Sequence, residues 1–279
     1  MKINVARSSG FCFGVRRAIN ISREMAAGRE NVCVLGDIVH NDFVVGDFRK
    51  RGLKKITRIK PAKRSTLIIS AHGAPKKTFE KAEKAGYRIV DATCPKVKDI
   101  YRIGREAEKT GRVIIIGDKG HQEVKGIAGQ LRKRPVIVES ARDVSAKKLS
   151  GIKKAAVITQ STQSAGNIKN VMWRLEKIIP SIKLLDTTCT TTRVKQREIA
   201  SLPKKNDLVL IIGSGTSANT KRLYQISRKI NRKTHWINNA KDLRYGWFRN
   251  IKSVGIMAGA STPDHVTSEV VAKLKEYSE

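Results

Sequence analysis

Three of the four cysteines in this chain stand at nearly the same distance before an apolar segment that ends in glycine. Cys12, Cys94 and Cys189 precede Gly36, Gly117 and Gly213 by 24, 23 and 24 residues. Equivalent units packed about an approximate three-fold axis would bring equivalent residues together near that axis. We therefore expect these three thiols to converge on one point as ligands. Cys33 lies inside the apolar run VCVLG and is expected to fill a core.

Three converging thiolates could do two kinds of chemistry. They could hold a zinc ion with an open fourth position, or a cubane iron-sulfur cluster in which one iron has no protein ligand. Catalytic zinc sites prefer histidine and carboxylate ligands, so the thiolate set favours the cluster. In both cases the open metal position would be the reactive one.

The elements that would position the cysteines form a repeated α/β pattern. Apolar runs such as VIIIG and LVLIIG predict buried parallel strands, each followed by a polar loop and a helix-sized stretch. The segments YRIVDATC and IKLLDTTC lead into Cys94 and Cys189, and the first residues, KINVARSSGFC, lead into Cys12 in the same way. We predict three similar α/β units with mainly parallel sheets, spanning residues 12–93, 94–188 and 189–279, the last completed by the strand in residues 1–11.

Polar side chains recur in the loops at the predicted carboxyl ends of these strands. Such imidazoles, hydroxyls and amides just before helix N-termini would form a phosphate cradle. The candidates are His40, His72, His121, Glu123, Ser161, Thr162, Ser217, Asn219 and Ser261. Glu123 is the carboxyl group two residues after a loop histidine, which suits a general acid that protonates a leaving hydroxyl. The alternative for Glu123 is a surface salt bridge to Lys125 or another basic residue.

The charge balance is unusually basic. Lys and Arg number 57 against 24 Asp and Glu, which gives a net charge of +33. Such a field attracts polyanions and acidic proteins, although basic residues spread along the whole chain also fit ordinary solvated faces. The apolar runs are only strand length and no apolar leader begins the chain, so we expect a cytoplasmic protein.

These motifs together resemble the 4-hydroxy-3-methylbut-2-enyl diphosphate reductase family of the methylerythritol phosphate route to isoprenoids. The resemblance covers residues 8 to about 264, and GFCFGV and GHQEVKG are its most specific motifs. It implies a trefoil-like assembly of three α/β units around a central 4Fe-4S cluster held by Cys12, Cys94 and Cys189. It also implies that two electrons and two protons remove the substrate hydroxyl as water, giving isopentenyl and dimethylallyl diphosphate.

The resemblance further implies a role for each loop residue. A diphosphate would be held by His40, His72, His121, Ser217, Asn219 and Ser261. Glu123 would deliver protons, and the hydroxyl of Ser161 or Thr162 would organise the substrate alcohol. Acidic carriers such as ferredoxin or flavodoxin supply electrons in the family, which fits a basic surface here.

Some positions depart from the family pattern, among them DTTCTTT at 186–192 in place of the usual DTICxAT. Other functional classes also compete with the family. TQST at 159–162 replaces the usual TQTT, and Ala218 replaces a serine, so one hydroxyl contact worth about 1 kcal/mol is missing. A dinucleotide-binding enzyme is disfavoured, because no acidic residue follows the GxGxxA-like segment from residue 214 to 241. A basic nucleic-acid-binding protein, or another iron-sulfur (de)hydratase acting on a phosphorylated substrate, remains the alternative.

Overall fold

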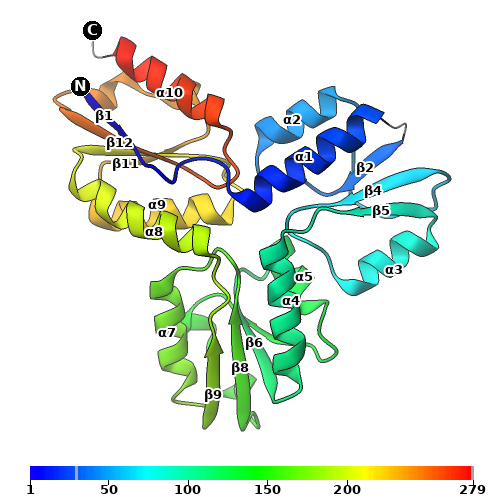
Figure 1. The fold of residues 1–279 in the computed structure, drawn as a ribbon. Helices are drawn as coiled ribbons and strands as arrows, with labels where there is room; N and C mark the ends of the chain where they lie inside the picture. The colour runs from blue at the N-terminus through cyan, green and yellow to red at the C-terminus, as the bar shows by residue number, and fades with distance from the viewer. Residues whose placement is uncertain (29–30, 278–279) are drawn as a thin grey trace. The chain divides into compact units, whose positions relative to one another are not determined.

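The computed structural model describes residues 1–28 and 31–277, in which strands and helices alternate along the chain (Figure 1). Within these residues the strands form three four-stranded sheets, and every strand pairing is parallel. The predicted α/β class with three parallel sheets is therefore confirmed. The chain divides into two compact units: residues 1–16, 39–47 and 190–279 form the first, and residues 17–38 and 48–189 form the second.

The sheet of the first unit joins the two ends of the chain. Its order is β1-β12-β10-β11. The strands are β1 (Lys2–Val5), β10 (Leu208–Ile212), β11 (Thr234–Ile237) and β12 (Ser253–Ala258). Lys2 pairs with Ser253 and Val5 with Ile256, so the amino-terminal strand is part of the sheet that contains β12.

The second unit contains two sheets with the same pattern of connections. Their orders are β3-β2-β4-β5 and β7-β6-β8-β9. The strands are β2 (Val32–Leu35), β3 (Lys54–Ile56), β4 (Ser65–Ile69), β5 (Tyr87–Asp91), β6 (Arg112–Ile116), β7 (Val136–Val138), β8 (Lys154–Thr159) and β9 (Ser181–Leu185). The sequence pattern does not predict the outer strands β3, β7 and β11, because they are short and lie at sheet edges.

Helices connect the strands. They are α1 (Phe13–Gly28), α2 (Asp42–Lys50), α3 (Lys76–Lys84), α4 (Pro95–Glu108), α5 (Gln122–Ala128), α6 (Ala146–Leu149), α7 (Ala165–Leu175), α8 (Thr190–Ser201), α9 (Ala218–Ile230) and α10 (Asp264–Glu276). In the part of the chain that the structure describes, none of these helices is long and apolar enough to cross a membrane.

The cores lie on both faces of each sheet, as β6 illustrates. Val113 and Ile115 of β6 pack with residues of α4 and α5, whereas Ile114 and Ile116 pack with residues of α7. These helices lie on opposite sides of the β6-β8-β9 strands (Figure 1). Because both faces of a parallel sheet are covered, its strands are almost continuously apolar, which is why the segment VIII was recognisable in the sequence. Cys33 belongs to the core of the β2-β4 sheet, and burial raises the pKa of its thiol, which confirms its predicted structural role.

Candidate functional site

The three cysteines predicted to act together occupy equivalent backbone positions. Cys12, Cys94 and Cys189 each stand immediately before a helix: α1, α4 and α8. Their backbone N–H groups donate to Ala260 O at 3.1 Å, Ala71 O at 3.0 Å and Ser161 O at 2.9 Å, respectively. Each accepting residue lies two positions after the end of a strand, namely β12, β4 and β8. The shared phase read from the sequence is therefore a shared backbone geometry.

The environment of these cysteines suits thiolate ligands. All three are partly exposed, in contrast to the buried Cys33. A helix N-terminus presents unpaired N–H groups with a partial positive charge, which attract an electron-rich sulfur. At Cys12 this effect is visible as a direct contact, because Val15 N lies 3.4 Å from Cys12 Sγ. Soft thiolates at accessible helix starts are the donors that an iron-sulfur cluster requires.

Glu123 is held in place by the loop that follows β8. Ser161 donates twice to its carboxylate, from N to Oε1 at 2.6 Å and from Oγ to Oε2 at 2.7 Å. Glu123 is only 3% exposed, so the alternative of a surface salt bridge does not describe its environment. The carboxylate is thus presented with both oxygens fixed, and the hydroxyl of Ser161 is directed at it.

The ring of His121 is oriented by its position at the start of α5. As the N-cap residue, His121 accepts a hydrogen bond from Glu123 N at Nδ1, at 3.1 Å. An accepting Nδ1 carries no proton, so the neutral ring carries its proton on Nε2. His121 therefore offers Nε2–H as a donor, which suits recognition of an anionic oxygen.

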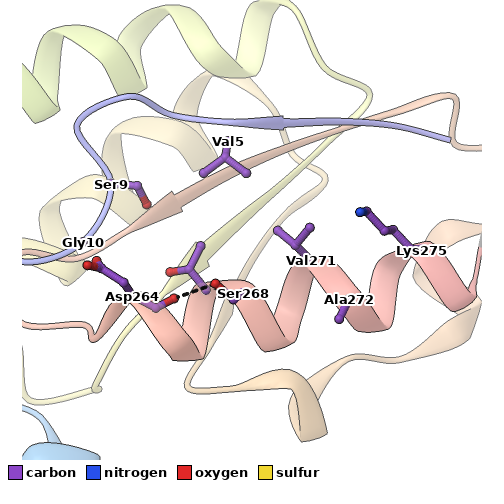
Figure 2. Close-up of a pocket in the computed structure, with 9 residues that line it drawn as sticks. Val5, Ser9, Gly10, Asp264, Ser268, Val271, Ala272 and Lys275 are labelled. Atoms are coloured by element: carbon purple, nitrogen blue, oxygen red, sulfur yellow. Dashed lines mark hydrogen bonds between the residues drawn. The ribbon is translucent and has the colours of Figure 1, made fainter.

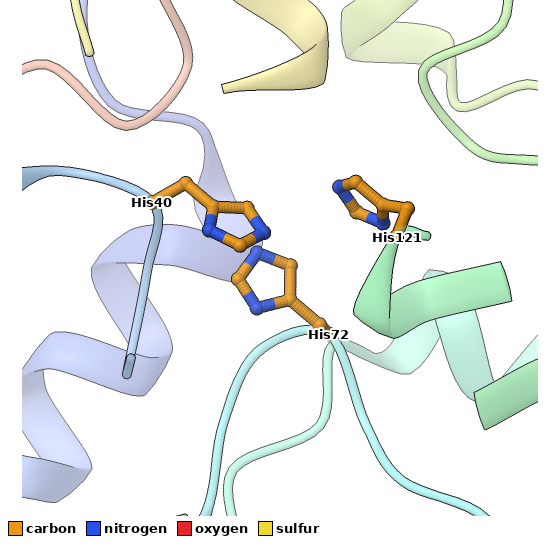
Figure 3. Close-up of side chains that lie close together, drawn as sticks. All are labelled: His40, His72 and His121. Carbon is orange, nitrogen blue, oxygen red and sulfur yellow. The ribbon is translucent and has the colours of Figure 1, made fainter. Parts of the chain in front are cut away.

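His72 lies beside His121 in the second unit (Figure 3). The two ring centroids are 5.6 Å apart and the rings are nearly perpendicular, at 85°. Gly73, which follows His72, has a φ of +73°, and a Cβ there would overlap the hydroxyl of Tyr101. Tyr101 is buried, and burial together with the charges of Glu123 and Asp91 raises its pKa. The Tyr101 ring therefore packs under the histidine loop as a neutral phenol.

In the first unit, polar groups of three loops have well-defined roles. Ser217 caps α9, its Oγ accepting from Thr220 N at 3.3 Å, and Ser261 Oγ donates to the carbonyl of His40 at 2.9 Å. Asn219 is 6% exposed, and its Nδ2 has no hydrogen-bond partner among the described residues. An unpaired buried amide donor is costly, so Asn219 is prepared for an acceptor such as a phosphate oxygen.

In the second unit, the side chain of Thr162 is unpaired, as that of Asn219 is in the first. Its Oγ1 is buried and finds no partner within residues 1–28 and 31–277. The neighbouring Ser161 hydroxyl is already engaged by Glu123. Of the two hydroxyls that the sequence offers for a substrate alcohol, that of Ser161 has already used its O–H donor, whereas that of Thr162 has not.

A groove of about 430 Å³ opens between α10 and the segment that carries β1 (Figure 2). Val5 and Val271 give it an apolar floor, and Ser9, Gly10 and Asp264 form its polar end. Gly10 lies two residues before Cys12. Two residues of the loop that leads to Cys12, Ser9 and Gly10, therefore line this groove.

Sequence reasoning did not identify three residues that shape these loops. Tyr101 supports the His72 loop, and Lys195 and Glu198 of α8 bind the loop before Cys12. The buried positions of α8 are Thr192, Lys195 and Ile199, at the spacing of one helix face. A lysine on that face is the signal that could have revealed Lys195, since lysine is almost never fully buried without partners.

The fold is that of an α/β protein with three parallel sheets. Each sheet has polar loops at the ends of its strands and an edge strand that leads to one of the three cysteines. The family model described as LytB protein matches residues 3–275. The 4-hydroxy-3-methylbut-2-enyl diphosphate reductase of Geotalea daltonii is 36% identical over 100% of this chain and 98% of its own length. That of Aquifex aeolicus is 33% identical over 99% and 97%. The chain belongs to the LytB family.

Two solved structures are similar to this chain over nearly its whole length. The E-1-hydroxy-2-methyl-but-2-enyl-4-diphosphate reductase of Plasmodium falciparum superposes with a TM-score of 0.91 at 29% identity, covering 98% of this chain and 88% of that one. A structure of (E)-4-hydroxy-3-methyl-but-2-enyl diphosphate reductase, described as the terminal enzyme of the non-mevalonate pathway, gives 0.71 at 32% identity, covering 99% and 100%.

Proposed function

We propose that this chain catalyses the reductive dehydroxylation of 4-hydroxy-3-methylbut-2-enyl diphosphate to isopentenyl and dimethylallyl diphosphate. Its membership of the LytB family over residues 3–275 supports this reaction. The observation that carries the proposal is the set of equivalent hydrogen bonds at Cys12, Cys94 and Cys189, because it gives three accessible thiols one common geometry in three sheets.

In this proposal the three cysteines hold a 4Fe-4S cluster. The cluster would supply electrons one at a time and an open iron position for the substrate hydroxyl. The donor set supports iron over zinc, since all three candidate ligands are thiolates at helix N-termini. The buried Cys33 takes no part, because its sulfur donates to Thr66 O at 3.4 Å inside the core.

In this proposal, side-chain donors at the strand-end loops bind the diphosphate. They are His40, His72, His121, Ser217, Asn219 and Ser261. The unpaired Nδ2 of Asn219 and the Nε2–H of His121 support this assignment, because both are donors that an anionic oxygen can accept from. Ala218, at the first position of α9, offers no hydroxyl, so the backbone N–H groups of the helix start carry more of the binding.

Glu123 delivers protons in this scheme. Its two hydrogen bonds from Ser161 hold the carboxyl group in one orientation, and its burial excludes bulk water as a competing proton source. Thr162 orients the substrate alcohol, and Ser161 positions Glu123. Electrons come from an acidic carrier such as ferredoxin or flavodoxin, for which a chain with a net charge of +33 provides long-range attraction.

We also propose that the three sheets correspond to three repeats, residues 12–93, 94–188 and 189–279, with residues 1–11 completing the last. The common order of the strands supports this division. In each sheet the strand that leads toward a cysteine is an edge strand: β5, β9 or β1.

The proposal is tested on protein purified without oxygen. We expect a brown protein with about four irons and four sulfides per chain and diphosphate-dependent oxidation of a reduced carrier. Replacing Glu123 with Gln is expected to leave the iron in place and to lower turnover by roughly 10²- to 10⁴-fold. Lys125→Gln, an exposed change on the same helix, is the matched control and should keep normal turnover. An iron-free, colourless protein after anaerobic reconstitution would contradict the proposal.

A further inference from the structure

We propose that Lys195 and Glu198 of α8 are positioning residues that together hold the loop leading to Cys12. The inference rests on the proposed function in one respect, the role of Cys12 as a ligand. The two side chains lie one helical turn apart on α8. Glu198 accepts hydrogen bonds from backbone N–H groups of residues 7 and 8, and Lys195 donates to the backbone carbonyls of residues 8 and 10.

Lys195 donates to three carbonyl oxygens. Its Nζ binds Ser8 O in a short contact, Gly10 O at 3.0 Å and Ala258 O at 3.3 Å. An ammonium group has three N–H donors, so this arrangement uses every one. Lys195 is only 1% exposed, and it is the largest of the fully buried side chains in the described residues. The loop and the end of β12 are thus fastened to the same buried cation.

Glu198 binds the same loop from its other side. Its Oε1 accepts from Arg7 N at 2.6 Å, and its Oε2 accepts from Ser8 N at 2.9 Å and Ser8 Oγ at 2.5 Å. Burial alone would raise the pKa of Glu198, but the hydrogen bonds from Ser8 and Arg7 and the charge of Lys195 outweigh it and lower the pKa. The carboxylate is therefore ionised at neutral pH, as this binding requires.

The loop before Cys12 makes few stabilising contacts within itself. It runs from the end of β1 at Val5 to Cys12 through residues 6–11 and passes through Gly10 at φ +83°. A Cβ on Gly10 would overlap the carboxylate of Asp264, so the backbone passes close to α10. Ser9 Oγ accepts from Ala258 N at 2.7 Å, which adds one contact to β12. Gly10 N also donates to Ala258 O at 3.4 Å and Ser9 N to Ala6 O at 3.1 Å. The two α8 side chains bind the N–H groups of Arg7 and Ser8, the Ser8 hydroxyl and the carbonyls of Ser8 and Gly10.

Keeping a lysine at this position is expensive for the fold. Burial lowers the pKa of Lys195 to about 8, although the charges of Cys12, Glu198 and Asp264 act in the opposite direction. The ammonium form still predominates at neutral pH. A buried cation is rarely the most stabilising choice on a helix face, so its presence indicates a role in specifying one conformation of the loop.

Hydrogen exchange of the full-length chain, measured with and without iron, tests the inference. In Lys195→Met, peptides covering residues 6–12 should exchange about tenfold faster or more, because the amides of residues 7, 8, 10 and 12 lose their fixed geometry. Peptides covering residues 89–94 should be unchanged. Arg197→Met removes an exposed cation from the same helix and serves as the matched control, with no change in either peptide. Equal exchange of residues 6–12 in Lys195→Met and the parent chain would overturn the inference.

Glu198→Gln keeps the test decisive if Lys195→Met does not fold, because Glu198 lies nearer the surface. It should accelerate exchange at residues 7 and 8, and unchanged exchange there would also overturn the inference. Iron release to a chelator gives the second readout: several-fold faster from either variant and unchanged from Arg197→Met. A parent chain that never binds iron would refute the proposed function. A parent that does, with variants that release it at the parent rate, would refute the positioning role alone.

Discussion

The loop before Cys12 and the connections before Cys94 and Cys189 each end at a cysteine with the same backbone hydrogen bond, but different contacts hold them. Residues 92–93 and 186–188 are short links that follow β5 and β9, whereas residues 6–11 form a longer loop after β1. At each of these links an aspartate, the last residue of β5 or the first residue after β9, accepts from the N–H of the threonine before the cysteine. Asp91 binds Thr93 N and Asp186 binds Thr188 N, both at 3.0 Å. The loop before Cys12 has no acidic residue in it.

The difference is one of sequence distance. An aspartate that binds the residue two positions ahead forms a local turn that needs nothing else to be folded. Lys195 and Glu198 contact their loop across 187 and 191 residues, so their bonds form only after both ends of the chain have met in one sheet. The links before Cys94 and Cys189 therefore include a local turn in addition to their hydrogen bonds to Ala71, Thr159 and Ser161, whereas the loop before Cys12 is bound by side chains that lie far away in the chain.

The largest expected effect tests whether the three cysteines remain equivalent despite this difference. Cys12→Ala and Cys94→Ala should each abolish binding of the proposed cluster, because each removes one of its three proposed protein ligands. Cys33→Ala should retain iron and lose only about 1 kcal/mol of stability through a small cavity. Iron and sulfide analysis of the three variants checks this. Retention of four irons by Cys12→Ala but not by Cys94→Ala would break the equivalence.

A smaller effect is expected from stiffening the loop before Cys12. Gly10→Ala should lower the free energy of unfolding by about 1–3 kcal/mol, because φ is +83° and the new methyl meets Asp264. Gly166→Ala, inside α7 where a Cβ meets nothing within 4 Å, should instead raise it by about 0.5–1 kcal/mol. Urea denaturation of both variants measures the two signs. A stabilised Gly10→Ala would show that the loop conformation is not strained.

The smallest expected effect is on stability, and its pH dependence distinguishes Glu198, which binds a distant loop, from Asp91, which binds a nearby residue. The folded state lowers the pKa of Glu198, so its contribution is complete above the ordinary carboxyl pKa and disappears as the pH falls through the lowered value. Glu198→Gln should cost about 1 kcal/mol at neutral pH, and progressively less as the pH falls below the ordinary carboxyl pKa, by urea denaturation.

Asp91→Asn is the counterpart in the second unit. It keeps an oxygen for Thr93 N and loses only the ion pair of Asp91 with Lys98, whose atoms are 2.6 Å apart. Its cost should therefore be smaller, about 0.5 kcal/mol. If Asp91→Asn proved the more costly of the two at neutral pH, the contrast between local and distant support would be wrong.

Features with a local sequence pattern were predicted from the sequence, whereas features that depend on contacts between distant residues were not. The apolar segments, the matching phase of Cys12, Cys94 and Cys189 and the placement of the first strand were all visible in the chain, because fully buried parallel strands and strand-end loops leave a strong local pattern. The strands β3, β7 and β11 were not visible. They are edge strands of three or four residues, and only their hydrogen bonds to β2, β6 and β10 make them strands.

The sequence by itself determined which residues are equivalent, since periodicity along the chain survives in any fold that repeats its units. Tertiary structure alone decided how each equivalent position is supported: Ser161 on Glu123, Tyr101 under Gly73, and Lys195 with Glu198 around the loop before Cys12. These contacts join residues far apart in the chain, and their energy comes from removing charged or polar groups from water into a fixed geometry. No local pattern encodes that step, because burial is a property of the folded chain.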